Sequence, residues 1–310
     1  MRILVLGGTG FVGGAAVRRL LEEGCDVVAF HRGESSGRAG TIRGDRRDLS
    51  RFRAEFERFA PDVVLDTIAY TERDAEDLVR TFRGIAGRIV VLSSQDVYAA
   101  YGRLLRLETG SRDAAPLSEG APLRESRHPY RAMAKPGEMA YDYDKILVER
   151  VAKADPGLPA TVLRLPSVYG PGDGHHRLRP YLERMTATEL LLDRAKAAWR
   201  WTRGYVEDVA DAIVLACRDS RAAGKTYNVG EAEALSEENW IRAIGKAAGW
   251  NGEIRTVARE ELPAALAEPY DFAHDLAADT SRIRDDLGFR EPIGRAEGLR
   301  RTVAWENAQQ

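Results

Sequence analysis

Cysteine is scarce in this chain, with only Cys25 and Cys217 among 310 residues. A disulfide framework is therefore not expected, and a reducing cytoplasm is the expected location. An excess of one charge is also lacking: the formal net charge is −2, so no overall field draws the chain to nucleic acid or to an anionic membrane. Long apolar runs are absent, and the apolar N-terminus is too short to be a signal peptide. The sequence predicts a globular protein with neither a nucleic-acid nor a membrane partner.

A glycine-rich turn between two apolar strands organises the first thirty residues. Arg2 to Leu6 is a short apolar run, typical of a strand buried on both faces. Gly7 to Gly13 follow directly, and apolar residues then recur at helical spacing from Ala15 to Leu21. Val27 to Phe30 form a second apolar strand. This order predicts the βαβ unit that holds a dinucleotide.

The glycines of this turn have distinct expected roles. Gly7 allows a sharp turn out of the strand, Gly10 lets a pyrophosphate approach the backbone, and Gly13 lets the helix pack closely on the sheet. The helix N-terminus offers free N–H groups to the phosphates. A glycine turn with a purely structural role is the alternative. The predicted cofactor-binding residues of this segment are Gly7, Thr9, Gly10, Phe11, Val12 and Gly13.

The tip of the second strand bears on the choice of cofactor. No acidic residue occurs at position 31 or 32 to bind the ribose hydroxyls of NAD, whereas Arg32 can pair with the 2′-phosphate of NADP. Arg38 and Arg43 are possible helpers; the alternative is a solvated arginine. Asp45 is predicted to reach the adenine amino group, with Arg46 beside it. NADP(H) is therefore favoured over NAD(H).

Strands and helices alternate along the rest of the N-terminal half, which predicts an α/β fold with a Rossmann-type, doubly wound parallel sheet. The expected strands cover 41–45, 61–66, 88–92 and 159–165, and the expected helices cover 49–59, 71–82 and 138–154.

The chain is expected to divide near residue 170. Residues 1–170 form the predicted dinucleotide-binding domain, in which 99–136 is a loop insertion with no clear period. Residues 171–310 form mainly a small mixed α/β substrate lobe, with 206–229 returning to the main sheet. In that lobe, 175–186, 236–248, 280–287 and 295–307 are predicted helices, and 199–203 and 254–257 are predicted to be extended.

Tyr141 and Lys145 are the predicted catalytic pair. Four residues apart on one helix, they would share a face, whereas Tyr143 would point elsewhere. The lysine ammonium lowers the pKa of the phenol, which can then exchange a proton with a substrate hydroxyl during hydride transfer. Ser94, at the end of the neighbouring strand, would hold the same oxygen, and Lys145 could also hold the nicotinamide ribose. A surface Tyr-Lys pair is the structural alternative.

Taken together, these motifs resemble the extended short-chain dehydrogenase/reductase family, also called the NAD-dependent epimerase/dehydratase family. The resemblance covers nearly the whole chain. It is carried by Gly7 to Gly13, Asp45, Ser93-Ser94 with Val97-Tyr98, Tyr141 with Lys145 and Glu149, Arg164 to Gly172, Tyr205 to Ala210, and Tyr227 to Gly230.

The resemblance implies a Rossmann domain with a nicotinamide cofactor and a C-terminal lobe for a small substrate, commonly a nucleotide sugar. It places the family's acid/base at Tyr141, its lysine partner at Lys145 and its hydroxyl at Ser94. It also implies a homodimer formed through the helices at 71–82 and 138–154.

Several positions depart from the family pattern. His31-Arg32 replaces an acidic residue, and Pro166-Ser167 replaces an asparagine; Pro166 is predicted to contact the cofactor. Gln95-Asp96 stands where dehydratases carry Asp-Glu and hexose epimerases carry uncharged residues, so half of the dehydratase acid/base pair is missing. The 99–136 insertion is longer than the usual loop. The predicted substrate-binding residues are Asp96, Ser167, Arg179 and Arg200.

Other features of the C-terminal part are ambiguous. A diphosphate would need arginine forks, which the lobe offers at Arg179 and Arg200, although a solvated arginine face is the alternative. Trp199 and Trp201 could stack on a nucleobase or belong to the core. His175-His176 has no partners for a metal site, so no metal is predicted.

The leading functional hypothesis is an enzyme that epimerises a nucleotide sugar by hydride transfer at a secondary alcohol or ketone. A net NADP(H)-dependent reductase of a sugar-like or other carbonyl compound is the alternative enzyme. A non-catalytic nicotinamide-binding regulatory protein is a third possibility.

Overall fold

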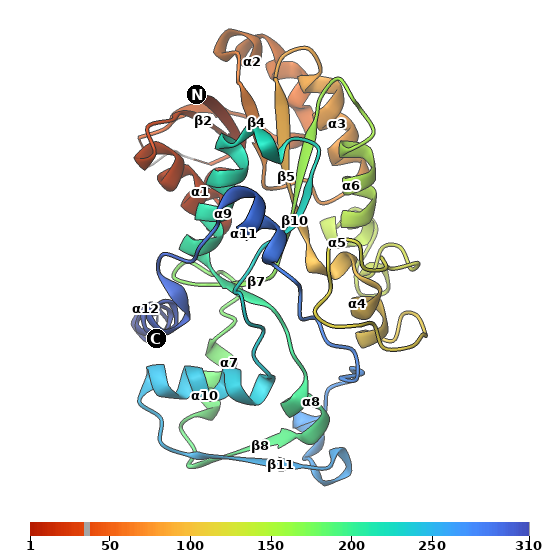
Figure 1. Cartoon of the computed structure of the whole chain (residues 1–310), viewed down its shortest axis with the longest axis vertical. Helices are drawn as coiled ribbons and strands as arrows, with labels where there is room; N and C mark the ends of the chain where they lie inside the picture. Colours follow the sequence, from red (N-terminus) through yellow and green to blue (C-terminus); the bar gives the residue numbers. More distant parts are fainter. Residues whose placement is uncertain (34–37, 310) are drawn as a thin grey trace.

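A seven-stranded parallel sheet forms the centre of the computed structural model, which describes residues 1–33 and 38–309 (Figure 1). The strand order is β10-β6-β5-β4-β1-β2-β3, and every neighbouring pair is parallel. The predicted α/β, Rossmann-type fold is therefore confirmed. The strands are β1 (Arg2–Leu6), β2 (Asp26–His31), β3 (Gly40–Arg43), β4 (Val63–Asp66), β5 (Arg88–Ser94), β6 (Ala160–Leu165) and β10 (Thr226–Asn228).

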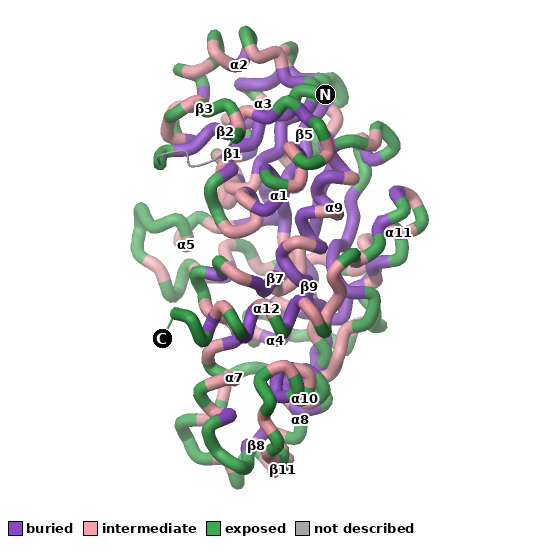
Figure 2. The backbone as a smooth tube through the Cα atoms, turned by 90° about the vertical axis from the view of Figure 1, so that its left-hand side faces the viewer, coloured by how far each residue is buried: buried purple, intermediate pink, exposed green. Residues whose placement is uncertain are grey.

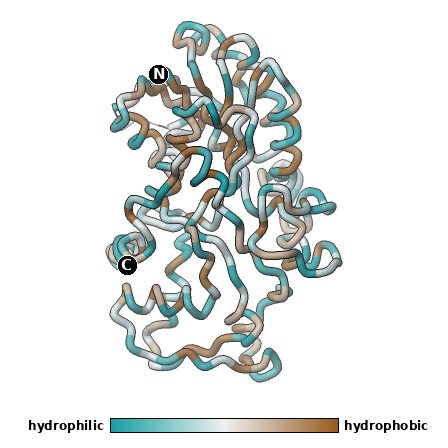
Figure 3. The backbone as a smooth tube through the Cα atoms, viewed as in Figure 1, coloured by the Kyte–Doolittle hydropathy of each residue, from teal (hydrophilic) through white to brown (hydrophobic). Residues whose placement is uncertain are grey.

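Helices cover both faces of this sheet (Figure 1). On one face, α1 (Phe11–Glu22) packs against α9 (Val206–Arg218); on the other, α3 (Glu72–Phe82) packs against α6 (Lys145–Ala152). Successive β1 residues alternate between the two layers: Ile3 and Val5 join the core with α1 and α9, and Leu4 and Leu6 join the core with α3 and α6. Burial on both faces explains why the strands are continuously apolar (Figures 2 and 3).

The C-terminal part builds a smaller layer at the far end of the molecule (Figure 1). It contains two further parallel strand pairs, and β10 leaves it to pair with β6, as predicted for 206–229. The division into domains at residue 170 stays a prediction. The elements of the C-terminal part are β7 (Ser167–Tyr169), α7 (Arg179–Arg184), β8 (Glu189–Asp193), α8 (Arg194–Ala198), β9 (Arg203–Tyr205), α10 (Glu237–Ala248), β11 (Glu253–Val257), α11 (Ser281–Leu287) and α12 (Gly294–Ala308). Of these, α11 does not belong to the far layer but packs against α9 and β10 (Figure 1).

Three expected segments differ from the structure. The helix predicted at 49–59 is a 3₁₀ turn, Arg46–Phe52, followed by α2 (Arg53–Phe59); Phe52, with φ −100° and ψ 10°, separates the two. The insertion at 99–136 contains α4 (Ala99–Leu104) and a 3₁₀ turn at Arg131–Met133. The helix predicted at 138–154 is interrupted after α5 (Met139–Asp142). In the described part of the chain, no helix has the length and apolarity needed to cross a lipid bilayer.

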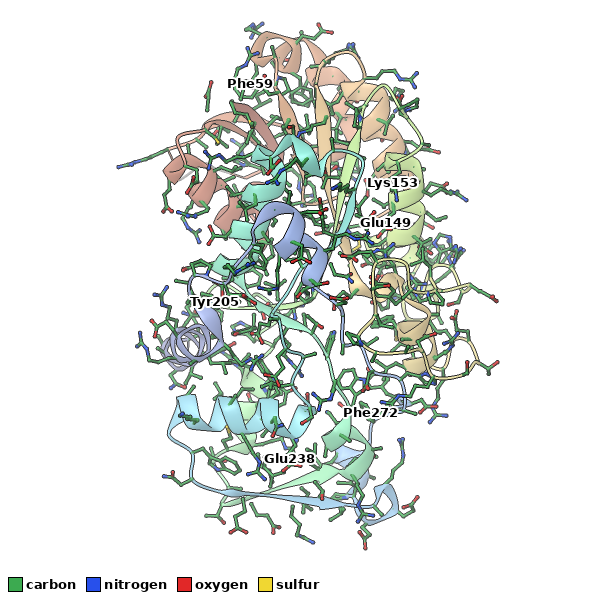
Figure 4. All side chains as sticks on the ribbon, viewed as in Figure 1. Phe59, Glu149, Lys153, Tyr205, Glu238 and Phe272 are labelled. Atoms are coloured by element: carbon green, nitrogen blue, oxygen red, sulfur yellow. The ribbon has the colours of Figure 1, made fainter. Side chains whose placement is uncertain are left out.

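A buried ion pair joins α6 to the sheet. Arg164 of β6 donates from Nε and Nη2 to the two carboxylate oxygens of Glu149, at 2.9 and 2.8 Å. The Ser93 hydroxyl donates to the same carboxylate at 2.6 Å. Figure 4 shows Glu149 on the sheet-facing side of α6. Because the two charges are about 4% exposed, each needs the other to offset its loss of hydration.

Arg164→Met tests this pair. The substitution leaves the Glu149 carboxylate buried without its counter-charge, so we expect the free energy of unfolding to fall by about 3–5 kcal/mol, measured by urea denaturation. Arg150→Met is the control, because Arg150 pairs with Glu72 on the exposed side of α6 and should change stability by only about 0–1 kcal/mol. Equal losses in the two variants would contradict this interpretation of the buried pair.

Candidate active site

The glycine turn has the geometry of a phosphate cradle. Gly7 has φ +86°, in the left-handed region that favours glycine. A Cβ at Gly13 would lie 2.3 Å from the Gly7 carbonyl oxygen, so α1 can start this close to β1 only with glycine at this position. Gly10 caps α1 with its backbone alone, which leaves the N–H groups of the first turn available to a ligand. These features fit the pyrophosphate of a dinucleotide.

A groove of about 1050 Å³ extends from this turn. That volume is at the upper end of the range of about 300–1000 Å³ typical for ligand sites. It lies where the strand order reverses, between β1 and its neighbours β2 and β4. Its lining includes Gly7, Thr9 and Gly10 of the turn, His31, Arg32, Asp45, Arg46 and Arg47 near the ends of β2 and β3, Tyr70, Arg73 and Asp74 around the start of α3, and Gly137, Glu138, Met139 and Asp142. The groove and the glycine cradle together fit a nicotinamide dinucleotide.

Cationic side chains gather at the β2–β3 end of the groove. Arg32 lines it and is exposed, as the sequence predicts, while Arg43 donates to the Arg32 carbonyl at 3.2 Å instead of lining it. Arg47 and Arg73 line the groove too and were missed, because no local motif marks them. His31 is buried there, and neither of its ring nitrogens has a hydrogen-bond partner among the described residues.

The predicted contacts of Asp45 and Arg46 compete with partners within the protein. Asp45 accepts hydrogen bonds from the side chain and main chain of Arg47, which lower the pKa of its carboxyl to about 2. Arg46 is buried and donates to Asp66 at 2.6 Å and Asp74 at 2.9 Å. Arg46 thus ties the end of β4 to the start of α3, and its contact with a cofactor stays a prediction.

The arrangement predicted for Tyr141 and Lys145 is wrong. Tyr141 belongs to α5 and Lys145 begins α6, so the two do not share a helical face. The Tyr141 ring lies against the Arg131 guanidinium, with 4.7 Å from Cζ to the ring centroid. Among the described residues, no hydrogen bond joins the Tyr141 hydroxyl to Ser94 or Lys145. The catalytic role predicted for Tyr141 therefore lacks the geometry on which it was based.

Asp144 causes the interruption between the two helices. Its main-chain N–H donates to the Tyr70 carbonyl at 3.0 Å, and Tyr143 forms an antiparallel bridge with Thr71. Its carboxylate caps the new helix by accepting from the Ile146 N–H at 2.9 Å. An aspartate directly before Lys145 is the sequence signal that could have revealed this break.

Tyr143 takes the place expected for Tyr141. Its hydroxyl donates to Asp96 Oδ2 at 2.7 Å, and the Ser94 hydroxyl accepts from the main-chain N–H of the same Asp96 at 3.2 Å. The Tyr130 hydroxyl lies 3.4 Å from the same Asp96 oxygen. Ser94 and Tyr143 are half-buried, whereas Asp96 is only 6% exposed. The structure therefore brings Ser94 and Asp96 together with a tyrosine that the sequence pattern predicts to point elsewhere.

Lys145 is a buried ammonium at the junction of the groove and this cluster. It donates to the carbonyls of Ala69 and Leu92 at 2.6 and 2.8 Å, and its Nζ lies 4.7 Å from the centroid of the Tyr70 ring. Burial lowers the pKa of the ammonium to about 8, against the opposing effect of Asp96 and Asp66. Its predicted contact with the nicotinamide ribose stays untested.

Burial also shifts the acidic groups of the cluster. It raises the pKa of the Asp96 carboxyl above the usual range, although the hydrogen bond from Tyr143 and the charge of Arg124 act in the opposite direction. It raises the pKa of the Tyr143 phenol well above its usual value, and the Asp96 charge adds to that rise. Both groups therefore hold protons more tightly than they would in water.

The other predicted site residues lie outside the groove lining described above. Pro166 packs near Gly204 and Gly230, and Ser167 is half-buried in β7. Arg179 pairs with Glu306 at 3.2 Å, and Arg200 donates to the Ala234 carbonyl at 3.0 Å. Their binding roles stay predictions, but both guanidinium groups already have partners in the protein.

Two of the ambiguous residues also have clear surroundings. Trp199 is core: it is 6% exposed and packs edge-on against Phe272, which Figure 4 labels in the C-terminal part. His176 pairs with Glu306 and lies parallel to Trp305.

Comparisons with known proteins agree with this fold. Residues 3–230 match the model of the "NAD dependent epimerase/dehydratase family". The sequence is 26% identical to a "Probable dTDP-glucose 4,6-dehydratase" of Sinorhizobium fredii, over 98% of this chain and 92% of that protein. It is 27% identical to a UDP-glucose 4-epimerase of Mycolicibacterium smegmatis, over 98% and 97% of the two chains. The solved UDP-glucose 4-epimerase of Thermus thermophilus in complex with NAD has a TM-score of 0.67 at 24% identity, covering 100% of both chains.

Gly13→Ala tests the cradle. The added Cβ must push the Gly7 carbonyl away, so we expect NAD(P) to bind at least about tenfold more weakly, a change of about 1.4 kcal/mol, measured by calorimetric titration. Gly14→Ala is the matched control, since its Cβ would meet no atom closer than 3.7 Å. Thermal unfolding without cofactor shows whether the fold survives. Unchanged affinity in folded Gly13→Ala would contradict the cradle.

Proposed function

Since this chain belongs to the NAD-dependent epimerase/dehydratase family, we propose that it is a nucleotide-sugar epimerase-type enzyme that works by hydride transfer at a secondary alcohol. The family match supports the general activity, that of an NAD(P)-dependent oxidoreductase. The finer proposal comes from the cluster at the end of the groove. The named relatives include a UDP-glucose 4-epimerase and a dTDP-glucose dehydratase, which suggests a nucleotide sugar as substrate.

One observation carries the proposal: Ser94 and Tyr143, both half-buried, are each hydrogen-bonded to Asp96 near a groove that fits a dinucleotide. Tyr70 connects the two features, because it lines the groove and its ring lies 6.3 Å from that of Tyr143. The nicotinamide, when bound, supplies a hydride acceptor and donor. Ser94 can hold the reacting oxygen of the substrate by a hydrogen bond, while a tyrosine exchanges its proton.

Epimerisation is preferred over dehydration because Asp96 is the one carboxylate, among the described residues, that the tyrosine hydroxyls of the cluster contact. The family's dehydratases carry adjacent acidic residues where this chain has Gln95 and Asp96. Gln95 is buried, and its amide donates to the Val229 carbonyl at 3.2 Å, which gives it a structural contact. Elimination of water needs a further acid and base, and Asp96 alone supplies one.

The function is tested by incubating the protein with UDP-glucose and dTDP-glucose without added cofactor and following the sugar protons by NMR. We expect conversion of at least one to its 4-epimer, with no net change in cofactor, because an epimerase regenerates its cofactor in each cycle. In a separate assay, stoichiometric oxidation of added NADPH by a carbonyl compound would instead identify a reductase, and a 6-deoxy product from dTDP-glucose would identify a dehydratase. Cofactor binding without any turnover would identify a binding protein.

Preference for NADP(H) is the second part of the proposal. Arg32, Arg47 and Arg73 line one groove, and Arg32 follows β2 where a 2′-phosphate would lie. Asp45 already holds Arg47, which leaves Arg32 the more available guanidinium. An arginine fork fits a phosphate better than the neutral ribose hydroxyl of NAD.

Arg32→Ala tests the preference. We expect the wild type to bind NADP more tightly than NAD, and the variant to lose about tenfold in NADP affinity, or about 1.4 kcal/mol, with NAD affinity nearly unchanged. Fluorescence titration of the reduced cofactors measures both. Arg51→Ala, at an exposed arginine outside the groove lining, is the control. A wild type that prefers NAD, or a variant with the wild-type ratio, would refute the role of Arg32.

A homodimer and a cytoplasmic location complete the proposal. The dimer would form through α3 and α6, which pack side by side (Figure 1). The exposed residues of these helices include Arg73, Glu76, Arg80 and Arg150. In a dimer formed through this face, the arginines of one copy would have to lie opposite acidic residues of the other.

A further inference from the structure

Asp96 is the centre of an unusual group of phenols. The hydroxyls of Tyr143 and Tyr130 both approach its Oδ2, at 2.7 and 3.4 Å, and Tyr130 in turn lies 2.7 Å from the hydroxyl of Tyr101. Asp96 Oδ1 is buried and has no hydrogen-bond partner among the described residues. A carboxylate with an unsatisfied buried oxygen is a strong proton acceptor.

Access differs sharply within this group. Ser94 and Tyr143 are half-buried, whereas Asp96 and Lys145 are only 6% and 4% exposed. A proton from a substrate would therefore reach Asp96 most directly through a hydroxyl that is already hydrogen-bonded to Asp96. Tyr143 is placed to supply it, because its hydroxyl donates to Asp96 Oδ2 at 2.7 Å, and Ser94 accepts from the main-chain N–H of the same Asp96 at 3.2 Å.

We propose that Tyr143, and not Tyr141, exchanges the proton with the substrate hydroxyl, and that Tyr143 relays this proton to Asp96. The inference rests on the hydride-transfer function proposed above. It differs from the Tyr-Lys mechanism implied by the resemblance, because a carboxylate, and not a lysine-stabilised phenolate, holds the proton while the substrate is oxidised.

Atoms and electrons balance in this step. The substrate O–H bond breaks and its proton bonds to the Tyr143 oxygen, while the Tyr143 O–H bond breaks and that proton bonds to Asp96 Oδ2. An oxidised nicotinamide, when bound, would accept the hydrogen of the same carbon together with the electron pair of the broken C–H bond. The substrate becomes a ketone and Asp96 a carboxylic acid. Reduction runs the same bonds in reverse and returns the proton to the sugar oxygen.

The charges around the pair favour this route. A free Tyr143 phenolate is disfavoured, because burial and the Asp96 charge raise the pKa of the phenol. Protonated Asp96 is favoured by burial and by the charge of Asp144, and opposed by Arg124 and Lys145. The remaining groups that face the pair are Tyr101, Tyr130 and Tyr70.

Tyr143→Phe and Tyr141→Phe separate the two assignments. Formation of bound NAD(P)H from a nucleotide sugar is followed in a single turnover at the nicotinamide absorbance. We expect Tyr143→Phe to slow this step by about 10²–10⁴-fold, the usual range for loss of a general acid/base, and Tyr141→Phe to have a much smaller effect. The reverse order would overturn the proposal.

Tyr130→Phe is the control for disturbance of the cluster. This substitution also removes a hydroxyl near Asp96, but that hydroxyl lies 3.4 Å from Asp96 Oδ2, farther than the 2.7 Å of Tyr143. We expect it to slow the reaction by several-fold at most. A loss as large as that of Tyr143→Phe would show that the cluster merely needs its hydroxyls for structure, which would contradict a relay.

Asp96→Asn tests the proton acceptor through the pH profile of the same step. In the wild type, oxidation is lost as pH falls through the pKa of Asp96, because the acceptor becomes protonated. Asparagine cannot take the proton, so Tyr143 must lose its own to solvent, and the rate in Asp96→Asn should rise with pH throughout the stable range. A variant that keeps the wild-type profile would exclude Asp96 as acceptor.

A measurement without substrate keeps the relay testable if no nucleotide sugar reacts. Tyrosine labelled with ¹³C at Cζ is titrated by NMR, and the Tyr143 signal is assigned from its absence in Tyr143→Phe. Removing the Asp96 charge and hydrogen bond in Asp96→Asn should lower the pKa of Tyr143, because both hold it up. An unchanged pKa would show that the two groups are not coupled and would overturn the relay. Failure of every sugar to react would overturn only the proposed function.

Discussion

The contact between Asp144 and Tyr70 determines the form of the active site. The Asp144 N–H donates to the Tyr70 carbonyl while the Asp144 carboxylate starts α6, so the chain must leave helical geometry at Tyr143. This interruption directs the Tyr143 hydroxyl toward Asp96. It also places the Lys145 ammonium against the main-chain carbonyls of Ala69 and Leu92. With an unbroken helix, a different tyrosine would face the sheet.

The central sheet places the remaining parts around this point. Because its strands are all parallel, their carboxyl ends meet at one edge. That edge holds the glycine turn after β1, Arg32 after β2 and Ser94 at the end of β5. The apolar strands supply the rigid support, with residues of β1 buried alternately in the two layers. Loop and helix-start residues supply the chemistry on that support.

Most of the buried charged side chains in this interior are paired with a side chain of opposite charge. Arg46 is buried with Asp66 and Asp74, and Glu149 with Arg164. Asp96 differs from them, because phenols are its direct hydrogen-bond donors and its second oxygen has no partner in the described chain. The paired groups hold elements together, whereas an incompletely paired carboxylate beside a reachable hydroxyl is suited to proton transfer.

Local patterns in the sequence predicted much of the fold and part of the site. The glycine turn was predictable because Gly7 and Gly13 meet a backbone constraint that lies within a few residues. Ser94 was predictable from its place at a strand end. Tyr143 was not predicted, because the spacing argument assumed an unbroken helix. Asp144 before Lys145 was a local signal of a helix start, but its main-chain bond to Tyr70 joins residues far apart in the chain and is visible only in the fold. Arg47 and Arg73 were missed for the same reason: only the folded chain brings them to one groove.

Hydride transfer at a sugar carbon is tested by following a deuterium atom at the reacting carbon of the nucleotide sugar through one epimerisation. If the hydrogen passes to the nicotinamide and returns, the deuterium remains on that carbon in the epimer and the oxidation step is slowed. Release of the deuterium to water would mean that the carbon loses a proton instead, and would contradict the oxidation and reduction proposed for this site.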